Sequence, residues 1–134
     1  MPQEFSVGIV LFHGDEWLLI QYKAGHWGFA KGKPYTGEKV LDAARREVLE
    51  ETGINGVFIA QEFSEKEEYF FKRAGKTVHK EVVYFLGEVP MKEVKLSEEH
   101  ISFKWLKYEE AMSLISFPQG KEILKRANDY RKVH

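Results

Sequence analysis

Residues 32–54 read GKPYTGEKVLDAARREVLEETGI, and within this stretch the pattern changes from that of a loop to that of a helix. Two glycines and a proline punctuate residues 32–37, which predicts a loop. From about Glu38 to Thr52 the apolar residues recur at helical spacing. They are Val40, Leu41, Ala44 and Val48. Gly53 follows where a left-handed C-terminal cap is favoured, so we expect one helix that ends there.

Three glutamates of this helix share one face. At about 100° per residue, Glu51 lies near +40° and Glu50 near −60° from Glu47. Glu47 itself points out of an arc that also holds apolar residues. Those residues are Val40, Ala43, Ala44 and Val48. A carboxylate turned toward the protein body must be paired, hydrogen-bonded or bound to a metal, although a solvated acidic face remains the alternative for three glutamates taken alone.

The ligand atoms on this face indicate which ion could join the three carboxylates. Oxygen ligands without cysteine or histidine favour a hard divalent cation, Mg²⁺ or Mn²⁺. Mg²⁺ usually keeps waters and shares its coordination sphere with substrate phosphates. Arg46 precedes Glu50 by four residues and can support it through an ion pair. The spacing therefore suggests phosphate chemistry.

Strand patterns lie on both sides of the helix. Before it, apolar runs at residues 5–12 and 17–22 flank a turn, which predicts a hairpin, and residues 27–30 fit a further short strand. The strand patterns after the helix cover residues 57–62, 69–72, 82–89 and 101–106, with a turn at Ala74-Gly75-Lys76. Two helical patterns follow at residues 108–115 and 118–130, and Pro118 suits a first helical turn. This mixed order predicts an α+β fold or an α/β/α sandwich.

Composition narrows the class of protein. The 134 residues contain no repeat or Pro/Gly/Ser linker, so we expect a single domain over residues 1–134. A net charge of −1 excludes a strongly basic nucleic-acid binder, and the absence of cysteine excludes thiolate zinc sites and cysteine nucleophiles. The chain has no apolar run of about 18 residues and no signal-peptide pattern, so we expect a cytoplasmic protein without a membrane partner.

Residues 32–54 also match the signature of the Nudix hydrolases at every defined position: Gly, five residues, Glu, seven residues, Arg-Glu, an aliphatic residue, one residue, Glu-Glu, one residue, Gly and an aliphatic residue. The matching positions are Gly32, Glu38, Arg46, Glu47, Val48, Glu50, Glu51, Gly53 and Ile54. So many defined positions make a specific signal. On these residues the chain resembles a member of that family.

The resemblance implies a Nudix-type α/β/α sandwich with a mixed β-sheet, whose loop-helix-loop binds divalent cations and hydrolyses a nucleoside diphosphate linked to another moiety. The metal ligands that it implies are Glu47, Glu50 and Glu51, assisted by backbone oxygens near Lys31 and Gly32. Arg46 would orient the carboxylates, and Glu38 would brace the loop. Mg²⁺ would be the cofactor, with Mn²⁺ as a substitute, and water would attack one phosphorus.

The flanking sequence resembles one branch of that family. WGFAKGKPYTGE, residues 27–38, is similar to the W-x-F-P-K-G-H-x-x-x-G-E stretch of asymmetric diadenosine tetraphosphate (Ap4A) hydrolases. LSEEHISFKWL, residues 96–106, is similar to their L-S-x-E-H-x-x-x-x-W-L stretch. The likeness implies that Glu99 is a further metal ligand or the general base, and that Lys31 holds a substrate phosphate. The other implied substrate contacts are Tyr22, His26 and Lys80 for phosphates, and Tyr69 and Phe117 for stacking on adenine.

Two departures leave the substrate open: Ala30 stands where that branch has proline, and Lys33 where it has histidine. The favoured function is Mg²⁺-dependent cleavage of Ap4A to ATP and AMP. The alternatives are removal of pyrophosphate from RNA 5′ ends, hydrolysis of ordinary or oxidised nucleoside triphosphates, and cleavage of nucleotide sugars. A regulatory module that binds a nucleotide without cleaving it is the alternative from another class, although it would be free to lose signature carboxylates that are all present here.

Overall fold

The structure is a computed structural model that describes residues 3–134. Its elements in chain order are β1 (Glu4–His13), β2 (Glu16–Tyr22), β3 (Trp27–Gly28), β4 (Ala30–Gly32), α1 (Val40–Thr52), β5 (Phe58–Ile59), β6 (Glu65–Arg73), β7 (Lys76–Glu88), β8 (His100–Lys107), α2 (Tyr108–Leu114) and α3 (Pro118–Val133). Within the described residues, no helix is long and apolar enough to cross a membrane.

Strand β1 lies in the middle of a mixed sheet. It runs parallel to β7, from Glu4 opposite Lys80 to Phe12 opposite Glu88. On its other side it pairs antiparallel with β4 in its middle, from Val7 to Ile9, and with β2 at its end. β8 extends the sheet beyond β2, and β6 pairs antiparallel with β7. The α+β fold with a mixed sheet predicted from the element order is therefore confirmed.

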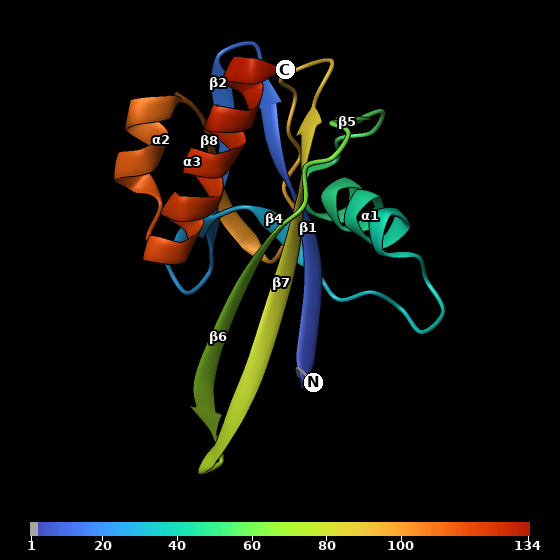
Figure 1. Ribbon diagram of the computed structural model, residues 1–134, viewed down its shortest axis with the longest axis vertical. Coiled ribbons are helices and arrows are strands. Elements are labelled where there is room, and N and C mark those ends of the chain that lie inside the picture. Colours follow the sequence, from blue (N-terminus) through green and yellow to red (C-terminus); the bar gives the residue numbers. More distant parts are fainter. Residues whose placement is uncertain (1–2) are drawn as a thin grey trace.

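Helices cover both faces of this sheet. Figure 1 shows α1 on one side of β1 and β7, and α2 with α3 on the other. Alternate residues of β1 enter two separate cores, because successive side chains of a strand point to opposite faces. Val7, Ile9 and Leu11 pack toward α1, whereas Val10 and Phe12 pack toward α2 and α3. The expected α/β/α layering is confirmed, and both faces of the central strand are buried.

Gly8 allows β4 to approach β1 closely. A Cβ atom at Gly8 would overlap the carbonyl oxygen of Ala30 and come within 2.9 Å of Cβ of Lys31 and 3.0 Å of the Tyr84 ring. Because the first obstacle is backbone, it cannot move aside as a flexible side chain could. Gly8 lies opposite Lys31 in the strand register, so this contact sets the position of the segment that leads into the Gly32 loop.

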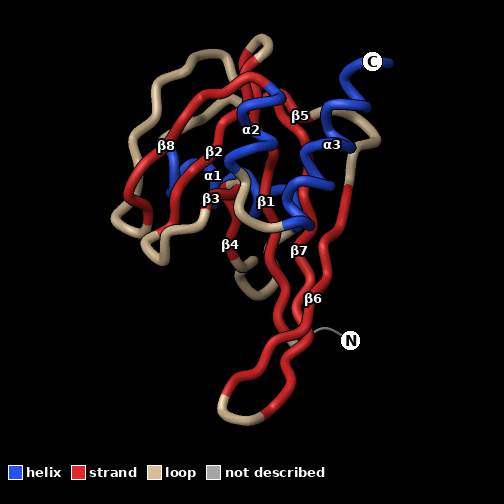
Figure 2. The backbone as a smooth tube through the Cα atoms, turned by 90° about the vertical axis from the view of Figure 1, so that its left-hand side faces the viewer, coloured by secondary structure: helices blue, strands red, loops and turns tan. Residues whose placement is uncertain are grey.

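The β6/β7 hairpin is longer than its sequence predicts. Figures 1 and 2 show it projecting beyond the helices. Its turn residues Ala74 and Gly75 have φ of 51° and 78°, which suits a two-residue turn that keeps the strands in register. Strands were predicted only at residues 69–72 and 82–89, because charged residues on both strands hide the apolar alternation. The predicted strand at 57–62 is wrong in extent: only Phe58–Ile59 pair with β7, and Glu62 has a φ of 64°.

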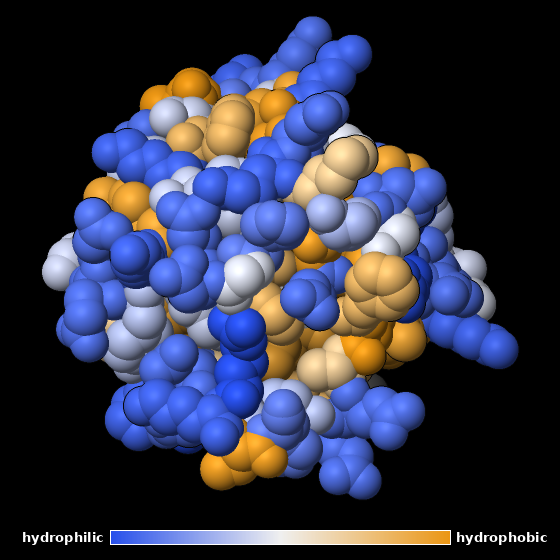
Figure 3. Space-filling view, turned by 90° about the horizontal axis from the view of Figure 1, so that it is seen from above, coloured by the Kyte–Doolittle hydropathy of each residue, from blue (hydrophilic) through white to orange (hydrophobic). Residues whose placement is uncertain are grey.

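The helix ends follow their sequence signals. Gly53 has a φ of 72° and donates its N–H to the carbonyl of Leu49 at 2.9 Å, which confirms the predicted cap of α1. α3 begins at Pro118, as predicted. Val40 was expected on the apolar arc of α1 but is 39% exposed, because it lies in the first turn, next to the exposed loop. On the face shown in Figure 3, apolar side chains form patches separated by hydrophilic residues, while the large apolar residues of β1 and β2 are buried.

We predict that Gly8→Ala lowers the free energy of unfolding by about 3 kcal/mol, because the new methyl group meets a backbone oxygen that cannot yield. The matched control is Gly28→Ala, where the nearest atom to a new Cβ is a Tyr22 ring carbon at 3.8 Å. Urea denaturation of the two variants measures the difference. Equal stability of the two would contradict the proposed close approach of β4.

Candidate active site on helix α1

The three glutamates of helix α1 differ in how deeply their side chains are buried. Ala43, Ala44 and Val48 are fully buried against the sheet and fix the rotation of the helix. The side chain of Glu51 is only 6% exposed and that of Glu47 13%, whereas that of Glu50 is 50% exposed. The predicted placement of Glu47 near the apolar arc is confirmed, and Glu51 lies deeper than Glu47.

Arg46 uses its guanidinium group to hold these acidic side chains. Its Nε and Nη2 donate to the two carboxylate oxygens of Glu38 at 2.9 and 3.0 Å. Its Nη1 donates to Glu47 and to Glu50, both at 2.8 Å. The remaining bond runs from Nη2 to the carbonyl of Lys33 at 2.9 Å, so all five N–H donors of the group have partners. The predicted ion pair with Glu50 is confirmed.

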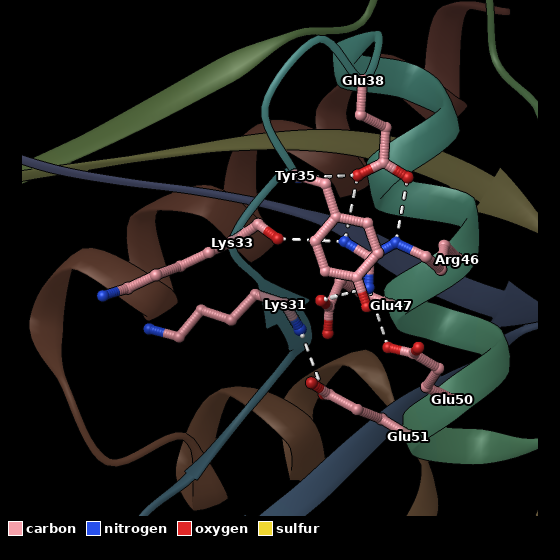
Figure 4. Close-up of polar contacts among 8 residues, drawn as sticks. All are labelled: Lys31, Lys33, Tyr35, Glu38, Arg46, Glu47, Glu50 and Glu51. Atoms are coloured by element: carbon pink, nitrogen blue, oxygen red, sulfur yellow. Dashed lines mark hydrogen bonds and ion pairs between the residues drawn. The ribbon is translucent and has the colours of Figure 1, made fainter.

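Tyr35 and Glu38 complete this arrangement, which Figure 4 shows in full. The guanidinium carbon of Arg46 lies 3.7 Å from the centre of the Tyr35 ring, within cation–π distance. Glu38 also accepts a bond from the Tyr35 backbone N–H at 2.9 Å, so it ties the loop to the helix. Hydrogen bonding to Glu38 raises the pKa of Arg46 further, and the group stays cationic at every physiological pH.

Gly32 forms a cradle for the Glu47 carboxylate. A Cβ atom at this position would overlap the carboxyl carbon and both oxygens of Glu47. Only a residue without a side chain therefore lets the carboxylate lie against the backbone of β4. Gly32 and Glu47, both within residues 32–54, are thus required for the same contact.

Glu51 is the most strongly perturbed acid of the site. Burial raises its pKa from 4.5 to about 9, and repulsion from Glu47 and Glu99 adds to this effect, while a hydrogen bond from the Lys31 N–H at 3.2 Å opposes it. A carboxyl group with such a pKa stays protonated at pH 7 unless a cation offsets its charge. Buried, mutually repelling oxygen ligands fit a hard divalent cation such as Mg²⁺.

The loop before β8 brings Glu99 to the same place. Backbone bonds from Lys95 to the carbonyl of Thr52 at 2.8 Å, and from Ser97 to that of Glu51 at 3.1 Å, fasten the loop to the end of α1. A cavity of about 430 Å³ results, lined by Tyr35, Arg46, Glu47, Glu50, Glu51, Ser97, Glu98 and Glu99. All four predicted metal ligands line it, although their role as ligands stays a prediction.

A second and larger cavity, of about 610 Å³, includes Lys31 in its lining. It holds five of the six residues predicted to contact substrate: Tyr22, His26, Lys31, Tyr69 and Phe117. The His26 ring stacks on Tyr22 with centroids 4.5 Å apart and lies 5.2 Å from Phe117. The Tyr22 hydroxyl donates to the carbonyl of Phe29, so its proton is already engaged. The cavity is therefore walled by rings and open to a flat apolar group.

The charged groups at this cavity differ in their environment. Burial lowers the pKa of Lys31 and of His26 from their ordinary values. Lys80 does not line the cavity; it lies opposite Tyr69 in the strand register, and burial lowers its pKa as well. Figure 4 shows the side chains of Lys31 and Lys33 extending to the same side, away from α1. The substrate roles of these residues stay predictions.

Two ionisable residues at or beside these cavities had no predicted role. Glu67 lines the larger cavity, and burial raises its pKa, but its segment was interpreted as a solvated hairpin. The alternation that places residues 67, 69 and 71 on one face of β6 was the available signal. His100 is buried beside Glu51 and belongs to the quoted LSEEHISFKWL stretch, yet no role was predicted for it.

A further acidic group lies outside both cavities. Glu68, His79 and Glu81 approach one another on the β6/β7 hairpin, within 4.8 Å between candidate ligand atoms. Lys66 lies 3.6 Å from the Glu68 carboxylate and 3.4 Å from that of Glu81. Lys66 thus offsets part of the charge of the two acids, and His79 Nε2 lies 2.8 Å from the Glu68 carboxylate, so the group is a cross-strand charge network.

Comparisons with known proteins agree with this geometry. The NUDIX domain model matches residues 2–127. A mouse protein named bis(5′-nucleosyl)-tetraphosphatase [asymmetrical] is 36% identical over 121 residues, covering 86% of this chain and 80% of its own. A Bartonella clarridgeiae RNA pyrophosphohydrolase is 32% identical over 144 residues, covering 86% of this chain and 82% of its own. A solved Caenorhabditis elegans Ap4A hydrolase binary complex superposes with a TM-score of 0.85 at 27% identity, covering 98% of this chain and 99% of that one.

The raised pKa of Glu51 predicts a pH-dependent stability. The folded chain binds the Glu51 proton up to about pH 9 and the unfolded chain only up to about 4.5, so stability from this group is present below about pH 4.5 and is lost as the pH rises toward 9. In chelator-containing buffer, Glu51→Gln should therefore be more stable than wild type, by an amount that grows from pH 5 to pH 9 and reaches about 2 kcal/mol or more.

Urea denaturation across this pH range measures the effect. Glu50→Gln, on the same helix but half-exposed, is the control and should show no such trend. A pH-independent difference between Glu51→Gln and wild type would contradict the assignment of a buried, ionisation-resistant carboxyl group.

Proposed function

This chain belongs to the NUDIX domain family, and on that premise we propose that it hydrolyses diadenosine tetraphosphate to ATP and AMP. One observation carries the proposal: Lys31 links a carboxylate-lined cavity to a ring-lined cavity, because its N–H binds Glu51 of the first and it lines the second. Such a pair of cavities suits a polyphosphate bridge on one side and a base on the other. Relatives named asymmetrical tetraphosphatases support the choice of substrate.

Glu47, Glu50, Glu51 and Glu99 are the residues that would hold Mg²⁺, with Mn²⁺ as a substitute. When bound, the cation supplies an activated water and neutralises charge on phosphate oxygens. Arg46 orients Glu47 and Glu50 through its paired donors, and Tyr35 and Glu38 keep the guanidinium group in place. Two of the four carboxylates, those of Glu47 and Glu50, are thus held in place by hydrogen bonds, as groups around a metal site often are.

The substrate would bind across both cavities. Lys31 and His26 would contact the phosphates, with Lys80 as a further cation opposite Tyr69, and Tyr69 and Phe117 would stack on an adenine ring. The Tyr22 hydroxyl is bonded to the Phe29 carbonyl, so Tyr22 would support His26 by stacking. Phe117 is 57% exposed at the start of α3, which leaves its face free for such a contact. Stacking on aromatic side chains is worth about 1–3 kcal/mol per base.

In the reaction, water attacks a terminal phosphorus of the bridge. A new P–O bond forms to the water oxygen, the bond to the adjacent bridging oxygen breaks, and ATP leaves as AMP forms. Glu51 or Glu99 accepts the water proton. Both carboxyl groups line the smaller cavity: Glu51 comes from α1 and Glu99 from the loop before β8.

We predict that the protein mixed with Ap4A and Mg²⁺ yields ATP and AMP in equal amounts, and that a chelator abolishes the reaction. Chromatography of the products checks this, beside GTP, oxidised dGTP, ADP-ribose and 5′-triphosphorylated RNA. Preference for the RNA would favour the pyrophosphohydrolase function suggested by the Bartonella relative. Binding of Ap4A without cleavage of any substrate would favour a regulatory module.

The same assay includes two variants with matched chemistry. Glu51→Gln removes a buried charge at nearly constant volume and should lower turnover by orders of magnitude. Glu98→Gln makes the same change in a neighbour that lines the same cavity without a predicted role, and it should keep most of the activity.

We further predict that Tyr69→Leu raises the KM for Ap4A about tenfold with little change in kcat, because the variant loses base stacking but keeps the carboxylates. Steady-state kinetics measure both constants. Phe71→Leu is the control, since Phe71 lies on the same face of β6, 6.3 Å from Tyr69 between ring centroids, but does not line the cavity. Equal KM values for the two variants would refute the stacking role.

A further inference from the structure

His100 is a buried polar residue that the function described above does not use. It begins β8 and lies opposite Tyr22 of β2 in the register, so the sheet fixes its backbone. Its side chain is 0% exposed. Within the described residues, its Nε2 is one of two buried side-chain polar atoms without a hydrogen-bond partner. An unpaired polar atom at such depth costs free energy, so its position requires an explanation.

The groups on either side of the His100 ring favour a proton on one of its two nitrogens. The Glu99 backbone N–H donates to Ser97 Oγ at 3.3 Å, and Ser97 Oγ lies 3.1 Å from Nδ1 of His100. Ser97 Oγ can donate its proton to Nδ1, whereas a Glu51 carboxylate that binds a cation is ionised and can only accept from Nε2. A neutral ring that accepts at Nδ1 carries its proton on Nε2.

The protonated nitrogen faces Glu51. Nε2 lies 3.6 Å from Oε1 of Glu51, slightly beyond hydrogen-bond distance. The Lys31 backbone N–H binds the same oxygen from β4 at 3.2 Å. Two nitrogens from different strands thus lie near one oxygen of a buried carboxylate. A small movement of the Glu51 side chain would bring Oε1 within hydrogen-bond distance of His100 Nε2.

We propose that His100 is a positioning residue whose Nε2–H donates to Oε1 of Glu51 and thereby fixes the Glu51 carboxylate for a divalent cation. The proposal rests on the proposed function only in taking Glu51 as a metal ligand. Groups that orient a ligand in this way typically change metal affinity 10–100-fold when they are removed.

The packing of the ring also connects the two cavities. The edge of His100 contacts Tyr22, with centroids 4.6 Å apart, and Tyr22 stacks on His26. Tyr22 and His26 line the larger cavity, and Glu51 lines the smaller one. The orientation of the Glu51 carboxylate is therefore set by groups that pack directly behind the wall of the larger cavity.

The first test reads the proton itself. Long-range ¹H–¹⁵N spectra of histidine-labelled, Mg²⁺-loaded protein should show the His100 proton on Nε2, and a Ser97→Ala variant should lose this single preference. His100→Gln assigns the signal by its disappearance. A proton on Nδ1 in the wild type would overturn the proposal.

The second test measures Mn²⁺ binding by calorimetry in four variants, with urea denaturation of each to check the fold. His100→Asn is too short to reach Glu51 and should weaken Mn²⁺ binding about tenfold or more, whereas His100→Gln can place an amide N–H where Nε2 lies and should restore most of the affinity. His13→Asn, whose ring bonds the Val89 carbonyl elsewhere, should bind like wild type. Glu51→Gln is the positive control.

The outcomes separate this proposal from the proposed function. If His100→Asn and His100→Gln weaken Mn²⁺ binding equally, or neither does while Glu51→Gln does, the positioning role is wrong and the Glu51 assignment stands. If the Asn/Gln contrast appears but Ap4A is not hydrolysed, the positioning role stands and the proposed substrate is wrong. Should His100→Asn fail to fold, the Ser97→Ala spectrum and its Mn²⁺ affinity decide the question.

Discussion

Acidic side chains that crowd one end of a helix need a fixed cation, and Arg46 provides it from within the same helix. Its planar group offers five donors in a rigid fork, and every one of them has a partner among three glutamates and a carbonyl. A lysine at this position could not bridge the same partners, because its ammonium group has three donors at one point. The loop before α1 is held by the same contacts, since Glu38 and the carbonyl of Lys33 both belong to it.

Close approach of backbone to backbone and of backbone to carboxylate determines where this helix meets the sheet. Gly8 admits β4 beside β1, and Gly32 at the end of β4 admits the carboxylate of Glu47. Gly8 therefore allows β4 to lie close to β1, and Gly32 allows α1 to lie close to β4. Lys31 precedes Gly32 on β4; its N–H bonds Glu51 of the smaller cavity, and the residue lines the larger one. A short strand thus carries the geometric link between the acidic and the ring-lined parts of the site.

Glu51 shows how burial prepares a carboxyl group for a cation. Its charge is disfavoured by burial and by neighbouring acids, and the N–H of Lys31 offsets only part of that cost. The group lies between the N–H of Lys31 on β4 and the ring of His100 on β8, whose Nε2 is 3.6 Å from Oε1 of Glu51. Residues from three separate parts of the chain thus converge on one carboxylate, which explains why the pairing of β8 with β2 matters at a site formed mainly by α1.

The sequence alone determined the helix, its cap, the acidic face and the family, because residues 32–54 hold all of these signals at local spacing. It also indicated the layered α+β fold, because the order of helical and strand patterns along the chain can be identified without knowing which strands pair. Only the tertiary structure decided the depth of Glu51, the meeting of Glu99 with α1, and the burial of His100 and Glu67, because each depends on contacts between segments far apart in the chain. The length of the β6/β7 hairpin was hidden for a related reason: its charged residues are held as strands by pairing across the hairpin, and that pairing leaves little mark on hydrophobic periodicity.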